Sequence, residues 1–171
     1  MMPANRRPGR SRIAAAAVPA RAGTAAAIGL VSALLSLLLA PPAAAQDFRS
    51  IGEPAAVLYD APSTKAKRMW VVGRGYPLQV ASMIEGWARV RDATGDTSWV
   101  ETRSLSTART VLVRATMGTL RDSPSERGAV VLRVGRDVVL DMVEAPVGDW
   151  VRVRHRDGAN GFIHVNQVFG L

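Results

Sequence analysis

The feature that most constrains the fold of this chain is an internal duplication. The run Trp87–Arg91 recurs as Trp150–Arg154 at a spacing of 63 residues. Upstream, Leu58–Ser63 recurs as Leu120–Ser125 at a spacing of 62, and one inserted residue, Asp149, accounts for the difference. Self-similarity at a near-constant period indicates repeated structural units. We therefore expect two copies of one small fold.

Short runs of β-branched and aromatic residues, separated by Pro and Gly, fill each copy and predict strands. In the first copy we expect strands near Ala56–Tyr59, Met69–Val72, Leu78–Ile84, Trp87–Arg91 and Ser98–Val100. In the second copy we expect them near Thr119–Arg121, Val130–Val134, Val138–Val143, Trp150–Arg154 and Gly161–Val165. Thr110–Val113, between the copies, is also strand-like and is a candidate to pair with one of the sheets. The predicted fold class is all-β.

The chain begins with a basic segment that contains Arg6, Arg7, Arg10, Arg12 and Arg21 but no acidic residue. An apolar run over 25–40 follows, and then the small residues Ala43, Ala44 and Ala45. This order is typical of a secretory signal peptide, so we expect cleavage between Ala45 and Gln46. The alternative is an uncleaved membrane anchor, but the run of 16 residues is shorter than the ~20 that a spanning helix needs. A twin-arginine signal is less favoured, because Pro8 and Gly9 follow the arginine pair.

Five segments make up the predicted layout. They are a cleaved signal peptide at 1–45, a short tail at 46–52, repeat 1 at 53–106, a strand-like linker at 107–116, and repeat 2 at 117–171.

Charge and cysteine content exclude several classes of protein. The whole chain has 22 basic and 14 acidic residues, but five basic ones lie in the leader, so residues 46–171 carry a net charge of only +3. The arginines alternate with apolar residues instead of clustering on one face, which argues against a nucleic-acid partner. The chain has no cysteine, which excludes disulfides and lipid attachment through cysteine. The expected location is periplasmic or secreted, with no membrane span after the signal is removed.

The order of motifs within each copy points to a known family. In the first copy it reads Leu-x-Asp-x-Pro-Ser at 58–63, Gly-Arg-Gly at 73–75, Gly-Trp-x-x-Val at 86–90 and Trp-Val at 99–100. This order resembles bacterial SH3-like (SH3b-type) domains, and Arg-Thr-Val-Leu-Val at 109–113 is similar to the bridge in exported tandem forms. The resemblance implies two tandem small SH3-like β-barrels after an N-terminal signal peptide.

The chain departs from the family pattern at a few positions. Tyr59 and Asp60 replace Arg-Ser, Ser98 replaces the Gly before Trp99, and Phe162 replaces a Trp in the second copy. These differences leave the expected fold unchanged but put shared ligand contacts in question.

Comparing the copies predicts which side chains face the core, since side chains alternate between the two faces along a strand. A charged residue in one copy marks its counterpart as outward-facing. The residues expected in the core on this basis are Trp70, Val72, Leu78, Val80, Ala88, Val90 and Val100 in the first copy, and Leu132, Val134, Leu140, Met142, Val151, Val153 and Ile163 in the second.

Five aromatic residues fall on the outward side and are the candidate ligand-binding residues: Tyr59, Trp87, Trp99, Trp150 and Phe162. Exposed rings flanked by Arg and Asp suit extended peptides or sugar faces. The alternative is that these rings cover the open end of each barrel or bury one another between the copies. The first copy, with three of the rings, is the better candidate.

Catalytic and metal sites are not expected. Cell-wall hydrolases use Cys with His, or His and carboxylates around zinc, whereas this chain has no Cys and only two histidines, His155 and His164. Gly73-Arg74-Gly75 lacks the Lys and the helix of a phosphate-binding loop. We predict no enzymatic activity and no cofactor.

The favoured hypothesis is an exported, non-enzymatic binding module for cell-wall peptides or an envelope protein. The family resemblance supplies the target class, and the sequence supplies the aromatic surface. One alternative is a structural or adaptor protein whose aromatics are buried between the repeats. Another is an accessory activator of a separate cell-wall hydrolase.

Overall fold

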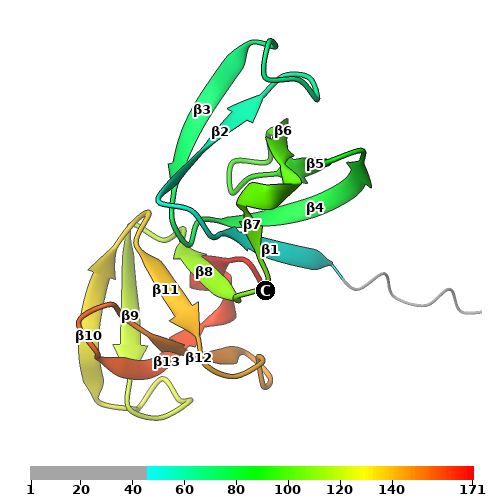
Figure 1. Ribbon diagram of the computed structural model, residues 1–171. Helices are drawn as coiled ribbons and strands as arrows, with labels where there is room; N and C mark the ends of the chain where they lie inside the picture. The colour runs from blue at the N-terminus through cyan, green and yellow to red at the C-terminus, as the bar shows by residue number, and fades with distance from the viewer. Residues whose placement is uncertain (1–45) are drawn as a thin grey trace, which may run out of the picture. The chain divides into compact units, whose positions relative to one another are not determined.

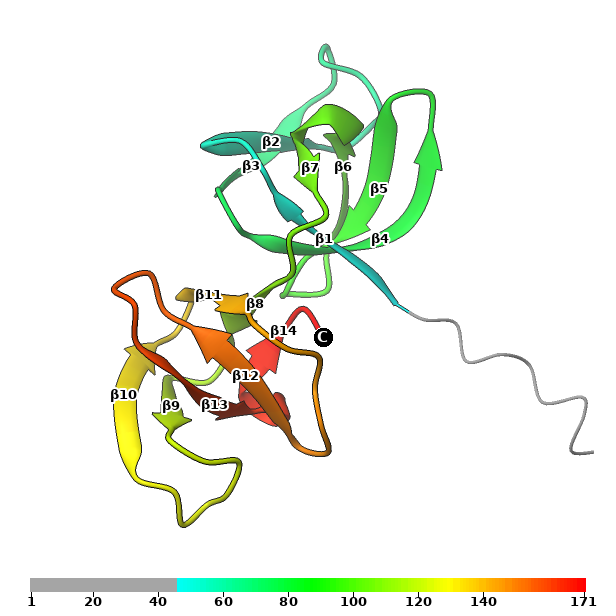
Figure 2. The same ribbon diagram turned by 60° about the horizontal axis from the view of Figure 1, so that its bottom comes forward.

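The computed structural model describes residues 46–171, so the predicted signal peptide at 1–45, including Ala45, lies outside the described residues. In the described part, the regular structure is antiparallel strand apart from two short 3₁₀ helices. The strands form two seven-stranded sheets, one for each repeat (Figures 1 and 2). The all-β prediction with two tandem units is confirmed.

Repeat 1 forms the first sheet, in the order β3-β2-β6-β5-β4-β1-β7. Its strands are β1 (Asp47–Ile51), β2 (Ala55–Tyr59), β3 (Arg68–Gly73), β4 (Pro77–Ile84), β5 (Trp87–Arg91), β6 (Thr97–Glu101) and β7 (Leu105–Ser106), with η1 (Thr102–Ser104) before the last strand. The register between β4 and β5 shifts between Val80 and Ser82. Such a bulge bends a strand and so helps a small sheet to curl around its core.

Repeat 2 forms the second sheet in the same order, β10-β9-β13-β12-β11-β8-β14. Its strands are β8 (Thr110–Val113), β9 (Met117–Arg121), β10 (Val130–Gly135), β11 (Val139–Met142), β12 (Trp150–Arg154), β13 (Asn160–His164) and β14 (Val168–Phe169), with η2 (Val165–Gln167) before the last strand. The sheet orders match strand for strand, which is what the duplication predicts.

The first strand of each repeat extends the duplication beyond the range expected from sequence. Asp47–Ile51 was expected to be part of a short tail, but it forms β1 and pairs with β4 and β7. The linker segment Thr110–Val113 forms β8 and pairs with β11 and β14 in the same way. The two strands share no identical residue at the repeat spacing, so comparison of the copies could not reveal β1.

Each repeat has its own hydrophobic core on the inner face of its sheet. The core of repeat 1 consists of Ile51, Ala56, Leu58, Leu78, Ala88, Val90 and Val100. The core of repeat 2 consists of Val111, Val113, Leu120, Val134, Leu140, Val151, Val153, Ile163 and Val168. The two lists share no residue. Val72, Val80, Leu132 and Met142 are partly buried and pack against these cores, as expected.

Trp70 is the exception among the residues assigned to the core. It is 58% exposed, whereas its counterpart Leu132 is partly buried against the core of repeat 2. Trp70 pairs with the buried Leu58, so it lies on the inward side of the sheet. Figure 1 shows the β2–β3 hairpin extending beyond the other strands of repeat 1, so little is left to cover the indole. Alternation along the strand thus predicted the correct face of the sheet for Trp70, but the projecting hairpin leaves its indole exposed to solvent.

Contacts between the repeats are concentrated around the start of β8. Thr110 Oγ1 donates a 2.6 Å hydrogen bond to the carbonyl oxygen of Gly75, and the Arg109 guanidinium lies 5.9 Å from the centre of the Phe48 ring. Phe48 and Phe169 meet edge to face with their ring centroids 5.2 Å apart. The rings that meet between the repeats are thus not those predicted as ligand-binding residues.

Candidate ligand-binding site

Three aromatic side chains lie together on the outer face of repeat 1, and we call them the aromatic face: Tyr59, Trp87 and Trp99. Tyr59 of β2 is directly opposite Trp99 of β6, and Trp99 is opposite Arg89 of β5. Residues directly opposite each other in an antiparallel pair project from the same side of the sheet. The structure therefore brings together the three residues predicted in this repeat.

The tight β4–β5 turn positions Trp87. Glu85 and Gly86 are the two loop residues, because Ile84 pairs directly with Trp87. Both have positive φ, 34° and 84°. Two-residue hairpins favour turns with positive φ at both loop positions, and Gly adopts this conformation without steric cost. The Gly-Trp motif is thus the end of this turn and the start of β5.

Tyr59 is on the predicted side but is only 8% exposed. Its ring lies edge-on to that of Trp87, with centroids 5.5 Å apart and an interplanar angle of 87°. Perpendicular packing of this kind is favourable for aromatic pairs. The expectation that all three rings are open to solvent is therefore wrong for Tyr59, while Trp87 and Trp99 are partly buried.

The corresponding face of repeat 2 has a different composition. Arg121 takes the place of Tyr59 and is directly opposite Phe162. The Arg152 guanidinium lies 6.0 Å from the centre of the Phe162 ring, and Trp150 packs against His164 at 5.3 Å. Phe162 and Trp150 are therefore also on the outer face, as predicted, and each has a ring or guanidinium partner from its own repeat.

A cavity of about 360 Å³ lies beside Tyr59 on the outer face of repeat 1. It extends from β2 across the β2–β3 loop to the end of β6 and η1. Its lining residues are Glu53, Ala55, Ala56, Val57, Tyr59, Thr64, Arg68, Glu101, Arg103 and Ser104. This volume is at the lower end of the range usual for small-molecule sites.

The cavity carries charges of both signs around the Tyr59 ring. Arg103 Nε donates a 2.6 Å hydrogen bond to Glu101 Oε2, and this bond raises the pKa of Arg103 above its ordinary value. Arg68 is directly opposite Tyr59 across the β2–β3 pair. A ligand with an amino group, a carboxylate and an apolar segment would find a partner here for each.

In repeat 2, the position equivalent to Tyr59 is tied to its own loop. Arg121 Nη1 donates a 2.7 Å hydrogen bond to the Gly128 carbonyl, and Nη2 lies 3.3 Å from Glu126 Oε2. The guanidinium is thus held by the β9–β10 loop. The two repeats share a fold but differ in the chemistry of this face.

Sequence comparison missed three of the charged lining residues, Arg68, Glu101 and Arg103. Their counterparts at the repeat spacings are Val130, His164 and Asn166, so none of them belongs to a repeated motif. The signal that could have found them is a difference between the copies and not a repeated motif. A position that is charged in one copy but not conserved as that charge in the other marks a specialised position.

Each histidine contacts a residue two positions further along the chain. His155 Nδ1 lies 2.8 Å from Asp157 Oδ1 in the β12–β13 turn, and His164 Nδ1 accepts a hydrogen bond from Asn166 N at the start of η2. A hydrogen bond from Ala159 N and the contact with His155 lower the pKa of Asp157. Within residues 46–171, no three His, Asp or Glu side chains lie close enough together to hold a metal ion.

The family model for the bacterial SH3 domain matches the chain twice, at residues 52–107 and 114–170. These matches cover well over half of the chain and coincide with the two sheets. The chain belongs to the bacterial SH3 domain family. Bacterial SH3 domains are typically non-catalytic binding modules and are often found in cell-wall proteins.

Three solved structures show weaker similarity. NlpC2 and NlpC1 from Trichomonas vaginalis are 15% and 17% identical to this chain, which covers 48% and 47% of their length with 73% and 75% of its own. An NlpC/P60 family protein from Bacillus cereus is 17% identical, with 72% of this chain covering 56% of that protein. All three TM-scores are 0.34, and the chain spans about half the length of these structures. Among curated proteins, none matches the chain significantly.

Within residues 46–171, no helix has the length and apolar character needed to cross a membrane.

Proposed function

We propose that this protein is an exported, non-enzymatic binding module whose first bacterial SH3 repeat binds cell-wall peptides or a peptide segment of an envelope protein. The observation that carries this proposal is the cavity beside Tyr59, which combines that ring with Arg68, Arg103, Glu53 and Glu101. Export is part of the proposal, and it is supported by the basic, apolar and small-residue order of the leader.

Peptides fit this site better than nucleic acids because of its charge pattern. Two acidic and two basic side chains line one cavity, so their charges balance. A polyanion would meet repulsion from Glu53 and Glu101, whereas a short peptide can offer both an amino group and a carboxylate. The partly buried rings of Trp87 and Trp99 extend the same face and offer apolar contact to a longer peptide.

The adaptor alternative, in which the aromatic face is buried between the repeats, has less support. Tyr59 packs against Trp87 of its own repeat, and the rings that meet between the repeats are Phe48 and Phe169. The activator alternative requires a separate hydrolase and rests on no contact within this chain.

Co-sedimentation of a protein comprising residues 46–171 with purified peptidoglycan sacculi tests the proposal. We expect the wild type to sediment with the sacculi and both Trp99→Ala and Arg68→Val to sediment less. Val is the residue that repeat 2 has at the position of Arg68, so the fold should accept it. The matched control is Phe162→Ala, which truncates the counterpart of Trp99 in repeat 2 and should bind as the wild type does.

Two outcomes would contradict parts of the proposal. If both repeat 1 variants keep their circular dichroism spectra and sediment as fully as the wild type, the aromatic face is not the site. If the wild type itself stays in the supernatant, intact cell wall is not the target. A peptide segment of an envelope protein is then the remaining candidate ligand.

A further inference from the structure

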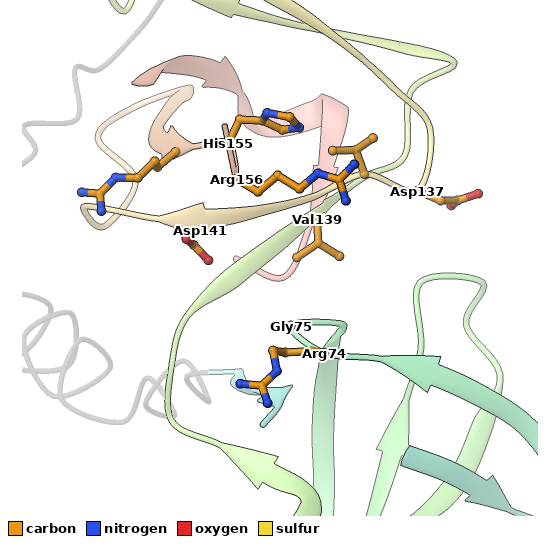
Figure 3. Close-up of a pocket in the computed structure, with 9 residues that line it drawn as sticks. Arg74, Gly75, Asp137, Val139, Asp141, His155 and Arg156 are labelled. Atoms are coloured by element: carbon orange, nitrogen blue, oxygen red, sulfur yellow. The ribbon is translucent and has the colours of Figure 1, made fainter. Parts of the chain in front are cut away.

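A second cavity, of about 570 Å³, is lined mainly by repeat 2. The β10–β11 turn and β11 contribute Asp137, Val138, Val139 and Asp141, and the end of β12 contributes Arg154, His155 and Arg156. The β3–β4 turn of repeat 1 adds Arg74 and Gly75. Figure 3 shows Arg74 and Arg156 on opposite sides of Val139.

Some arginines of residues 46–171 have an ion-pair partner and others have none. Arg49, Arg103, Arg121 and Arg152 each form an ion pair with an acidic residue close in sequence. Within residues 46–171, Arg74, Arg154 and Arg156 form no ion pair, and the same is true of strand arginines such as Arg89 and Arg133. The three differ from those strand arginines in lining one cavity, where no acidic partner from the described residues neutralises their charge.

The absence of ion pairs holds even though two carboxylates line the same cavity. Asp141 is directly opposite Arg154 across the β11–β12 pair, yet Arg154 Nε donates to Asn160 Oδ1 at 3.2 Å instead. In Figure 3, the Asp137 carboxylate points away from Arg156. Three guanidinium groups against two carboxylates leave the cavity with a positive balance even when His155 is neutral.

The position of Arg74 in this cavity is set by contacts of Gly75. The buried Thr110 donates its 2.6 Å hydrogen bond to the Gly75 carbonyl. Gly75 has a φ of 79°, and a Cβ at this position would come within 3.1 Å of Val139 Cγ1. Only a residue without a side chain fits such a conformation at this distance without strain. The turn that presents Arg74 is therefore anchored against repeat 2.

We propose that this arginine-lined cavity binds a small anionic ligand through Arg74, Arg154 and Arg156. A planar guanidinium can make two parallel hydrogen bonds to a carboxylate or a phosphate, and such charge-assisted bonds are among the stronger ones in proteins. The volume is within the range usual for small-molecule sites. This site is separate from the aromatic face and does not depend on the function proposed for it.

Isothermal titration calorimetry on a protein comprising residues 46–171, which contains both sheets and both cores, tests this inference with two probes. Citrate represents carboxylate ligands and inorganic phosphate represents phosphate ligands. We expect saturable binding of at least one probe that weakens as the salt concentration rises. Binding of citrate alone identifies a carboxylate site, binding of phosphate alone a phosphate site, and binding of both a general anion site.

Substitutions then separate the cavity from general surface charge. Arg74→Gln and Arg156→Gln should each weaken binding by about tenfold or more, as expected for the loss of a charge-assisted hydrogen bond. Asp141→Asn should instead tighten binding by up to about fivefold, because it removes a nearby negative charge. The matched control is Arg133→Gln, which removes an exposed arginine of β10 that also forms no ion pair in the described part of the chain and lines neither cavity, so binding should be unchanged.

Either of two results would overturn the inference. One is that neither probe gives saturable binding to the wild type. The other is that Arg133→Gln weakens binding as much as Arg74→Gln and Arg156→Gln do, which would show a nonspecific effect of net charge. Thermal unfolding of each variant checks that the exposed substitutions leave the fold intact.

Discussion

The two separate cores predict that each repeat loses stability on its own when its core is damaged. Leu120 is fully buried in the core of repeat 2, and its counterpart Leu58 is fully buried in the core of repeat 1. We expect Leu120→Ala to destabilise repeat 2 by about 2–5 kcal/mol, because truncating a buried Leu removes apolar contact and leaves a cavity. A unit of this size typically has a total stability of about 3–9 kcal/mol.

The loss should therefore be large compared with what holds repeat 2 together. With a urea dependence of about 1–3 kcal/mol per molar, the unfolding midpoint of repeat 2 should fall by roughly 1 M or more. Leu58→Ala should have the same effect on repeat 1. The fully buried position is the same in both copies, so each variant serves as the control for the other.

The distribution of tryptophans provides the assay. Trp70, Trp87 and Trp99 are in repeat 1, whereas Trp150 is the one tryptophan of repeat 2. The indole N–H signals in nuclear magnetic resonance spectra recorded across a urea series thus report on each repeat separately. In Leu120→Ala, the Trp150 signal should move to its unfolded position at lower urea while the other three stay close to their wild-type midpoint.

The outcome that would refute this reasoning is a common shift. If all four indole signals move together and by the same amount in both variants, the repeats unfold as one cooperative unit. The contacts around Thr110 and the Phe48–Phe169 pair would then couple the two cores more strongly than their separate composition implies.

Three further predictions concern single side chains. Asp92→Ala should lower the free energy of unfolding, measured by urea denaturation, by about 1–3 kcal/mol. The reason is that the buried Asp92 Oδ1 accepts hydrogen bonds from the backbone N–H groups of Thr94, Gly95 and Asp96. An unchanged urea midpoint would contradict this. Burial is the main cause that raises the pKa of Tyr76. The contribution of the neutral Tyr76 side chain to folding stability is therefore complete below pH ~10 and is lost as the pH rises through the folded-state pKa. The free energy of unfolding should therefore fall less steeply above pH ~10 in Tyr76→Phe than in wild type. Parallel curves of unfolding free energy against pH would contradict this role of Tyr76. Thr110→Val should cost about 1–2 kcal/mol in the same assay by removing the hydrogen bond to Gly75, with Thr107→Val as the exposed control.

The duplicated part of the fold could be predicted from the sequence because each copy reports on the other. A charged residue such as Arg133 or Asp141 marks the outward side of its strand, and alternation then places Val134 and Leu140 in the core, where the structure has them. The same reasoning placed Trp87 and Trp99 on the outer face.

The features that escaped prediction are those in which the copies differ or in which the fold departs from a regular strand. β1 was missed because none of its residues is identical to the residue at the repeat spacing in β8. Trp70 has the inward parity of Leu132 but lies on a hairpin that extends past its core. Tyr59 is covered by Trp87, a contact between strands that alternation along one strand cannot reveal.

The pairing of the first and last strands within each repeat has a consequence for how such chains can grow. β1 lies beside β7, with Ile51 opposite Leu105, and β8 lies beside β14, with Leu112 opposite Phe169. The chain therefore enters and leaves each barrel at adjacent points on one edge. A copy can be added, deleted or circularly permuted there without breaking a central strand, and such changes are best tolerated where chain ends lie close together. Concatenation of these modules is thus open to evolution and to protein engineering alike.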